Sequence, residues 1–211
     1  MSSETKLEQL PRGALVEGEA FVDVDVARVA AVEVYKCRFD NCRFVEASFD
    51  KVVFEAVEFK DCDLTRVKWG SSSLRGVKFI DCKLLGVNFA ALNDNPDVSF
   101  ERCLLRYAVF DGVACRGARF VDCNLAEANF NETDLRDADF SLSDFTLAVI
   151  KKCTLAGADF STSTGLYFDP AANQSKDAFI AVETAVQIAQ AAGLRVAGYD
   201  DAKGSKAKRR R

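Results

Sequence analysis

Histidine is absent from the 211 residues, and this removes the most common acid–base group and a frequent zinc ligand. The cysteines form no Cys-x-x-Cys pair, which also argues against a zinc site. None of the serines lies in the sequence context of an activated nucleophile. We therefore expect no catalytic constellation, no metal and no cofactor, and we expect the protein not to be an enzyme.

Long apolar runs are missing as well. Residues 1–18 lack the apolar stretch of a signal peptide, and no segment approaches the roughly 18 apolar residues of a membrane-spanning helix. We therefore expect a cytoplasmic protein without membrane contact. The net charge is −4, although six of the last nine residues are Lys or Arg. The rest of the chain is more acidic than the total, which argues against direct nucleic-acid binding by the body.

Large apolar residues recur at every fifth position over most of the chain. The series runs from Phe39 to Phe89 and again from Phe100 to Phe160, which gives 24 repeats. A small residue stands two positions before each large one. A period of five fits neither the 3.6 of a helix nor the 2.0 of a strand. A chain that turns a corner every five residues points both side chains inward, and four corners make a square coil of twenty residues that stacks about 4.8 Å from the next.

Residues twenty apart should then stack and be chemically alike, which two columns confirm. The small column contains Cys42, Cys62, Cys82, Cys103, Cys123 and then Ser143. A second column, made of large residues, follows the same twenty-residue period if residues 90–97 contain one residue more than a regular turn. The turn sequence Asn93 to Pro96 lies in that segment. This column predicts a core ladder of Phe39, Phe59, Phe79, Phe100, Phe120, Phe140 and Phe160. All the cysteines occupy inward columns, so we interpret them as free, buried core residues.

The repeated triplets Ala128–Phe130, Ala138–Phe140 and Ala158–Phe160 have the pattern Ala-(Asp/Asn)-Phe, which is similar to that of the pentapeptide repeat family. The segments that follow, Tyr167–Pro170 and Gly193–Val196, resemble the C-terminal cap of one subgroup, the Qnr, MfpA and albicidin-immunity proteins. Residues 85–89 and 99–103 also resemble that subgroup. The resemblance implies an all-β fold, a right-handed quadrilateral β-helix with a C-terminal α-helical cap and dimerisation segment.

Members of that subgroup are dimeric rods that bind DNA gyrase or topoisomerase IV, resemble the DNA that the enzyme holds, and protect it from antibiotics that poison it. The resemblance therefore implies a DNA-mimicking protection protein, acting in resistance or self-immunity, that forms a homodimer. The alternative is an interaction rod of the same fold with a different protein partner. The Qnr proteins of Gram-negative bacteria carry two protruding loops, whereas this chain has one short interruption.

Acidic residues toward the C-terminal end and the interruption are the candidate topoisomerase-binding surface. Several of the acidic residues stand just before the large repeat residue, where Asp and Asn also favour turn hydrogen bonds. That structural interpretation competes with a role in binding. The candidates are Asn93, Asp94, Asn95, Asp97, Asp122, Asp134, Asp137, Asp139 and Asp144.

A helix is predicted near residues 176–192, with Ser175 as its N-cap, Asp177 in its first turn and Gly193 just past its end. Its apolar face is wide enough to cover the end of the β-helix and also to meet a second copy, and capping alone is the alternative. The predicted dimer interface comprises Phe168, Phe179, Val182, Val186 and Ala189.

The chain divides into four predicted parts. Residues 1–20 are expected to be a flexible N-terminal segment, and residues 21–165 the β-helix with its short loop at 90–97. Residues 166–197 are expected to form the helical cap and dimerisation segment, and residues 198–211 a disordered basic tail.

Overall fold

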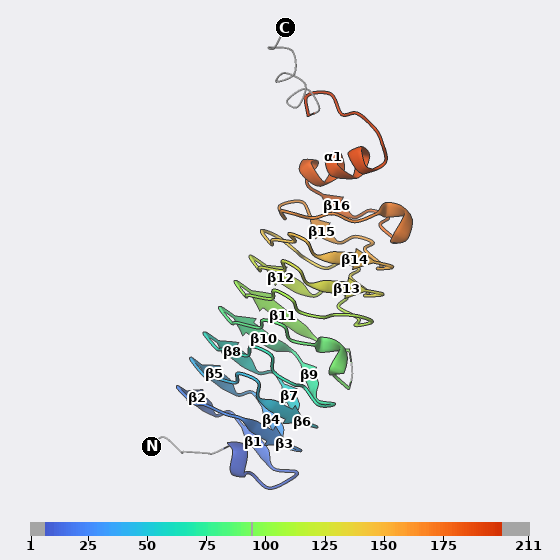
Figure 1. Ribbon diagram of the computed structural model, residues 1–211. Helices are drawn as coiled ribbons and strands as arrows, with labels where there is room; N and C mark the ends of the chain where they lie inside the picture. Colours follow the sequence, from blue (N-terminus) through green and yellow to red (C-terminus); the bar gives the residue numbers. More distant parts are fainter. Residues whose placement is uncertain (1–6, 94, 200–211) are drawn as a thin grey trace.

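The computed structural model describes residues 7–93 and 95–199. These residues form a parallel β-helix of about eight turns that ends in a single α-helix, as the sequence predicts (Figure 1). The predicted flexibility of residues 1–6 and disorder of residues 200–211 lie outside the described residues.

Each turn of the β-helix has four faces, which we number 1 to 4 in the order in which the chain visits them from Ala20. Every strand pair is parallel and joins one turn to the next. Face 1 carries β2 (Ala20–Val22), β5 (Arg38–Asp40), β8 (Glu58–Lys60), β10 (Val77–Ile80), β11 (Val98–Glu101), β12 (Arg119–Val121), β15 (Asp159–Phe160) and β16 (Phe179–Ile180).

The other faces are built in the same way from shorter segments. Face 2 is held by single bridges, such as Leu104 to Asn124 and Asn124 to Asp144. Face 3 carries β3 (Arg28–Ala30), β6 (Ser48–Asp50), β13 (Asn129–Asn131) and β14 (Val149–Lys151). Face 4 carries β1 (Leu15–Glu17), β4 (Glu33–Tyr35), β7 (Val53–Glu55) and β9 (Ser73–Arg75).

The predicted phenylalanine ladder is confirmed inside face 1. Phe100 and Phe120 stack at 4.9 Å between ring centroids, and Phe120 and Phe140 stack at 5.0 Å. Phe79 pairs with Phe100, one position beyond the regular period, so the extra residue lies in the predicted interruption. That interruption consists of η2 (Phe89–Ala91) and the loop that follows, which runs from the corner between faces 3 and 4 across face 4.

The inward small residues have a role beyond filling space. The Cys82 thiol donates a hydrogen bond to the Phe59 carbonyl, and the Ser143 hydroxyl donates one to the Phe120 carbonyl. Thr133 makes the same bond to the Phe110 carbonyl. A backbone acceptor at the corner of one turn is therefore satisfied from the next turn, which buried polar groups require. Cysteine, serine and threonine are equivalent in this role, and this explains why Ser143 continues the cysteine column.

Most corners place one residue in the left-handed region of the backbone. The φ angle is 51° at Asn41, 54° at Asp122 and 58° at Asp137. Glycine, asparagine and aspartate adopt this conformation most readily, because other side chains crowd the neighbouring carbonyl. Lysine, glutamate, arginine, serine and alanine also occur at these positions, so the corners accept a range of residues.

The β-helix extends further in both directions than predicted. Strand β1 pairs with β4, and Leu7 of η1 (Leu7–Gln9) is buried, so residues 7–20 are ordered where flexibility was expected. The first turn is shorter than a regular one, because Phe21 already pairs with Phe39, and the five-residue period is lost there. At the other end β16 pairs with β15, which carries the β-helix past the predicted boundary at residue 165.

The predicted start of the C-terminal helix is wrong. Helix α1 spans Val182–Ala191, and its N-cap is Ala181 without a side-chain hydrogen bond. Asp177 has a φ of 58° and forms another corner of the β-helix, with Ala178 N–H donating to the Ser175 carbonyl. The predicted end is confirmed, since Gly193 has a φ of 81° and Leu194 N–H donates to the Ala189 carbonyl.

Candidate protein-binding surface

The acidic column before the large repeat residue is used by the fold itself. The Oδ1 atom of Asp139 accepts the Ser141 N–H at 3.0 Å, and that of Asp144 accepts the Thr146 N–H at 2.9 Å. Asp63, Asn88, Asn124, Asp134 and Asp159 make the same bond to the amide two residues on. The interpretation of this column as turn chemistry is thus confirmed.

Three of the candidate acidic residues also have basic partners. Asp134 lies 2.5 Å from Arg136, and this ion pair holds the pKa of its carboxyl below the ordinary value. Asp137 lies 3.2 Å from Arg116, and Asp139 lies 3.5 Å from Arg119. Burial alone would raise the pKa of Asp139, but hydrogen bonds from Ser141 and the charge of Arg119 more than offset it. These pairs reduce the negative potential that the three carboxylates present to a partner.

The structure does not bring the acidic candidates together on one face. Asp134 lies on face 4, Asp137 at the corner between faces 4 and 1, and Asp139 on face 1. Asp144 lies on face 2, and Asp122 at the corner between faces 1 and 2. Within the described part of the chain, Asp122 and Asp144 form no ion pair. These two neighbouring carboxylates are therefore not neutralised by a basic side chain in that part of the chain and can interact with a partner.

The interruption is tied to the β-helix. Asn93 N–H donates to the Ser72 carbonyl, and Asp97 N–H donates to the Leu74 carbonyl. The Asn95 side chain accepts the Ala114 N–H at 3.1 Å, so it replaces the backbone acceptor that a regular turn would supply. All three residues are exposed, and Asp94 lies outside the described residues. The loop presents side chains to solvent but is held in place by the turns below and above it.

The predicted dimer interface is divided by the structure. Phe168 and Val186 are buried within the single chain, where the last turn meets α1, so they are not free to contact a second copy. Phe179 and Val182 are 64% and 61% exposed, and Ala189 is half-buried. Leu194 and Tyr199 are also exposed at this end, and the sequence interpretation missed them. The apolar surface available at the C-terminal end is therefore Phe179, Val182, Leu194 and Tyr199.

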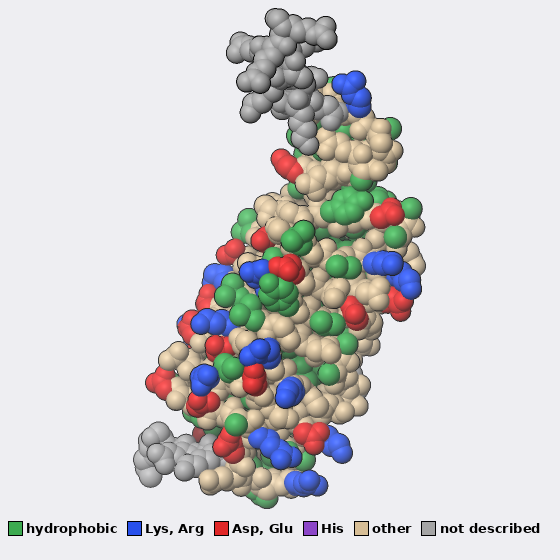
Figure 2. Space-filling model, in the orientation of Figure 1, with side chains coloured by type: hydrophobic (Ala, Val, Ile, Leu, Met, Phe, Trp, Pro, Cys, Tyr) green, Lys and Arg blue, Asp and Glu red, His purple; other side chains and the backbone are tan. Residues whose placement is uncertain are grey.

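A second group of exposed apolar side chains lies on face 2 and its corners, and it was also missed. The exposed fraction is 51% for Tyr107, 63% for Leu142 and 75% for Leu147. Figure 2 shows hydrophobic side chains exposed among charged ones along the upper turns of the rod. The signal was present in the sequence, because each of the three stands two positions after a large repeat residue, where most repeats have a polar residue or glycine.

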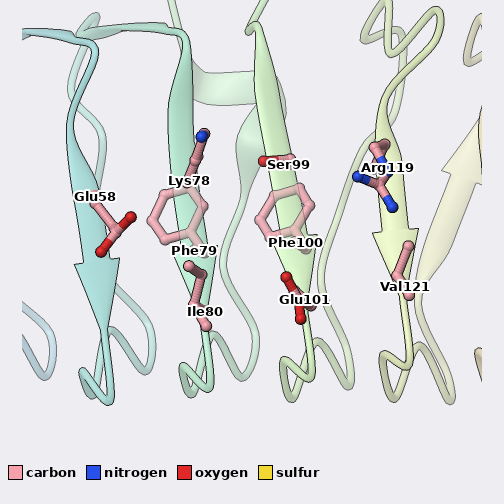
Figure 3. Close-up of a pocket in the computed structure, with 9 residues that line it drawn as sticks. All are labelled: Glu58, Lys78, Phe79, Ile80, Ser99, Phe100, Glu101, Arg119 and Val121. Atoms are coloured by element: carbon pink, nitrogen blue, oxygen red, sulfur yellow. The ribbon is translucent and has the colours of Figure 1, made fainter.

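A shallow depression of about 180 Å³ crosses the outer surface of face 1 between β8 and β12 (Figure 3). Lys78, Ser99 and Arg119 form one row along it, and Ile80, Glu101 and Val121 form the next. Its lining is mixed in charge: the two carboxylates, Glu58 and Glu101, lie two strands apart in different rows, and Lys78 and Arg119 also line the hollow. The geometry fits a shallow surface hollow between outward side chains.

The eight cysteines are all free and buried, as predicted. Burial raises the pKa of the Cys115 thiol to about 12. No cluster of three or more metal-ligating side chains occurs among residues 7–93 and 95–199. In the same part of the chain, no helix has the length and apolar character needed to cross a membrane.

The pentapeptide repeat region profile matches residues 32–110 and 94–160, which together cover more than half of the chain. The chain belongs to the pentapeptide repeat family. Two solved structures of QnrB1, described as a plasmid-mediated fluoroquinolone resistance protein, resemble this pentapeptide repeat protein over 88% of its length. Both are trypsin-treated single-substitution variants of QnrB1. One has a TM-score of 0.63 at 16% identity over 98% of its chain. The other has a TM-score of 0.64 at 17% identity over its whole chain.

A search of curated protein sequences finds no match to this pentapeptide repeat protein. At 16% and 17% identity, the likeness to QnrB1 shows the fold alone.

Proposed function

We propose that this protein binds a type II topoisomerase, DNA gyrase or topoisomerase IV, and protects it from an antibiotic that poisons the enzyme. The observation that carries the proposal is the match to QnrB1, which includes essentially the whole of that chain. QnrB1 is a fluoroquinolone resistance protein, and the resemblance of the cap segments supports the same subgroup. The protein acts by occupying a surface of the enzyme, not by altering the drug.

The charge distribution supports a contact at the C-terminal half. Residues 97–181 contain 13 acidic and eight basic residues, whereas residues 21–96 contain 12 and 11. Duplex DNA carries about one negative charge per 1.7 Å of its axis, a density far above that of the upper turns. The ion pairs of Asp134, Asp137 and Asp139 reduce the effective charge further. We therefore propose that charge contributes to the contact and that shape and apolar contacts supply the rest.

A homodimer is part of the proposal. The exposed Phe179, Val182, Leu194 and Tyr199 gather at the C-terminal end, where a second copy would extend the rod. Exposed apolar residues clustered at one end of a soluble protein mark a contact surface. The alternative is a rod of the same fold that binds a different protein partner.

The first experiment is a gyrase supercoiling assay with a drug that traps the cleaved DNA complex. Purified protein at several-fold excess over gyrase should restore supercoiling and reduce linear DNA, and the drug should be recovered unchanged by mass spectrometry. If the protein neither relieves poisoning nor inhibits supercoiling, the topoisomerase proposal is wrong and the rod has another partner.

The second experiment tests the charge contribution without disturbing the turns. Asparagine keeps the Oδ1 acceptor that the corners need, so the triple variant Asp137→Asn, Asp139→Asn and Asp144→Asn should fold normally. It should protect less well, and raising the salt concentration should reduce the difference from the parent protein. The matched control, Glu33→Gln with Glu55→Gln and Asp61→Asn, neutralises three exposed carboxylates in the lower turns and should protect normally. Equal protection by both triples would show that the acidic candidates do not contribute.

A further inference from the structure

Three large apolar residues occupy corner positions that suit neither their chemistry nor their backbone conformation. Tyr107, Leu142 and Leu147 have φ angles of 62°, 62° and 60°. All other non-glycine residues with positive φ in the described chain are polar, charged or alanine. A leucine with positive φ destabilises the fold by about 1–2 kcal/mol. Because the side chain is exposed, no hydrophobic burial compensates for this cost. The fold would be served better by asparagine, aspartate or glycine at each position.

The three residues border the same face. Leu142 lies at the corner between faces 1 and 2, and Leu147 lies at the corner between faces 2 and 3 of the same turn. Tyr107 lies two turns below Leu147, since Tyr107 N–H donates to the Ala126 carbonyl and Glu127 N–H donates to the Thr146 carbonyl. Leu104, 41% exposed, lies on face 2 between the two corners. Apolar side chains thus lie at both edges of face 2 and, at Leu104, on the face itself.

Tyr107 is held in a fixed arrangement. The Arg106 guanidinium lies 5.0 Å from the centre of the Tyr107 ring and donates a hydrogen bond of 3.0 Å to its hydroxyl. Glu127, one turn above, accepts a bond of 2.5 Å from the same guanidinium. A tyrosine that is already ordered loses little conformational entropy on binding, which is why Tyr and Arg recur among the residues that dominate interfaces.

Two of the acidic candidates belong to this surface: Asp144 lies on face 2 between the two corners, and Asp122 lies at the corner between faces 1 and 2, one turn below Leu142. Asp122 is exposed and Asp144 is half-buried, and neither forms an ion pair in the portion of the chain that is described. Glu127, Tyr107 and, more weakly, Asp144 raise the pKa of Arg106, which shows that Asp144 belongs to the same surface. The face therefore offers apolar side chains at its edges and negative charge between them.

We propose that this surface, Leu104, Tyr107, Asp122, Leu142, Asp144 and Leu147, is the face that contacts the topoisomerase, and that the contacted site presents a basic side chain between apolar ones. The inference rests on the proposed function and deepens it, because it assigns one side of the rod and the chemistry of the site that receives it. Leucines kept at unfavourable exposed corners are explained by a partner that buries them, since local conflicts with the fold concentrate at functional sites.

The test replaces the two leucines of one turn with asparagine. Asparagine adopts positive φ more readily than leucine, so Leu142→Asn with Leu147→Asn should melt at the same temperature as the parent protein or above it. Its dissociation constant for gyrase, measured by fluorescence anisotropy of labelled protein, should rise at least tenfold, and the concentration for half-maximal rescue of supercoiling should rise in parallel. The control Ala56→Asn introduces asparagine at a positive-φ corner between faces 4 and 1 and should leave both values unchanged.

The outcomes separate this inference from the function on which it rests. If the parent protein does not bind or rescue gyrase, the proposed function fails and this inference fails with it. If the parent protein rescues gyrase and the double variant does so equally well, the function stands and the assigned face is wrong. A double variant that loses binding together with several degrees of melting temperature would show that the leucines are structural, which also overturns the inference.

Discussion

Truncation of a mid-ladder phenylalanine tests whether the core is packed as a continuous column. Phe120 is fully buried and stacks on Phe100 at 4.9 Å and on Phe140 at 5.0 Å. Its edge also meets Phe110 at 5.4 Å and Phe130 at 6.3 Å. Backbone hydrogen bonds fix the spacing of the turns, so the neighbours cannot collapse into the space that Phe120→Ala leaves. The expected loss in the free energy of unfolding is about 3–5 kcal/mol.

The matched control is the first member of the ladder. Phe21 stacks on Phe39 alone and is 5% exposed, so Phe21→Ala should cost less than Phe120→Ala. Urea unfolding can be followed by the fluorescence of Trp69, the single tryptophan, which is buried and stacked on Phe49 at 5.5 Å. Circular dichroism followed in parallel checks that the transition is two-state. A loss below about 1 kcal/mol for Phe120→Ala, or an equal loss at Phe21, would refute the continuous column.

Three further predictions concern the cap, the thiols and one glycine. Val182→Asp should separate the proposed dimer in light scattering at tens of micromolar without lowering the melting temperature, whereas Val186→Asp should lower it, because that side chain is buried within one chain. The native thiols should not react with an aromatic disulfide reagent at pH 8. Rapid labelling of the folded protein would contradict the burial of the thiols. Because burial raises the pKa of Cys115 to about 12, the free energy of unfolding should fall as the pH rises from about 8.5, the pKa of an unfolded cysteine, toward 12. Gly165→Ala should lower the free energy of unfolding by about 2 kcal/mol, because the new Cβ would lie 2.7 Å from the Thr146 nitrogen. Gly112→Ala, with open space around the new Cβ, should lower it by about 1 kcal/mol. Chemical denaturation measures both values, and equal losses would contradict the clash.

The sequence predicts the fold well where the five-residue period is intact. The ladder from Phe39 to Phe160 and the extra residue near residue 95 follow from spacing alone, because stacked columns require chemically similar side chains. Residues 7–20 were placed outside the β-helix because the turn from Phe21 to Phe39 is shorter than the period requires, so the inward Val16 and Phe21 are out of step with the ladder that follows. The helix start was misplaced because Ser175 and Asp177 match a helix N-cap as well as they match a corner.

The binding surface was less predictable, although part of the signal was available. Residues five apart occupy successive faces, so Asp134, Asp139 and Asp144 cannot share one face once the coil is accepted. The ion pairs of Asp137 and Asp139 depend on which arginine lies one turn away, Arg116 or Arg119, and this follows only from the coil register. The burial of Val186 depends on how α1 packs on the last turn, which no local pattern specifies.

Turns of different length coexist in one rod without loss of register. The turn from Phe21 to Phe39 is short, the turn from Phe39 to Phe59 is regular, and the turn from Phe79 to Phe100 is long. The stack is aligned by inward side chains and by hydrogen bonds between turns, so chain length at a corner is free to vary. Lengthening a surface loop costs only about 0.6 kcal/mol per doubling. The corner at residues 92–97 is therefore a natural insertion point, where a short epitope or reporter peptide can be grafted while the rod keeps its axis, its core and every other face.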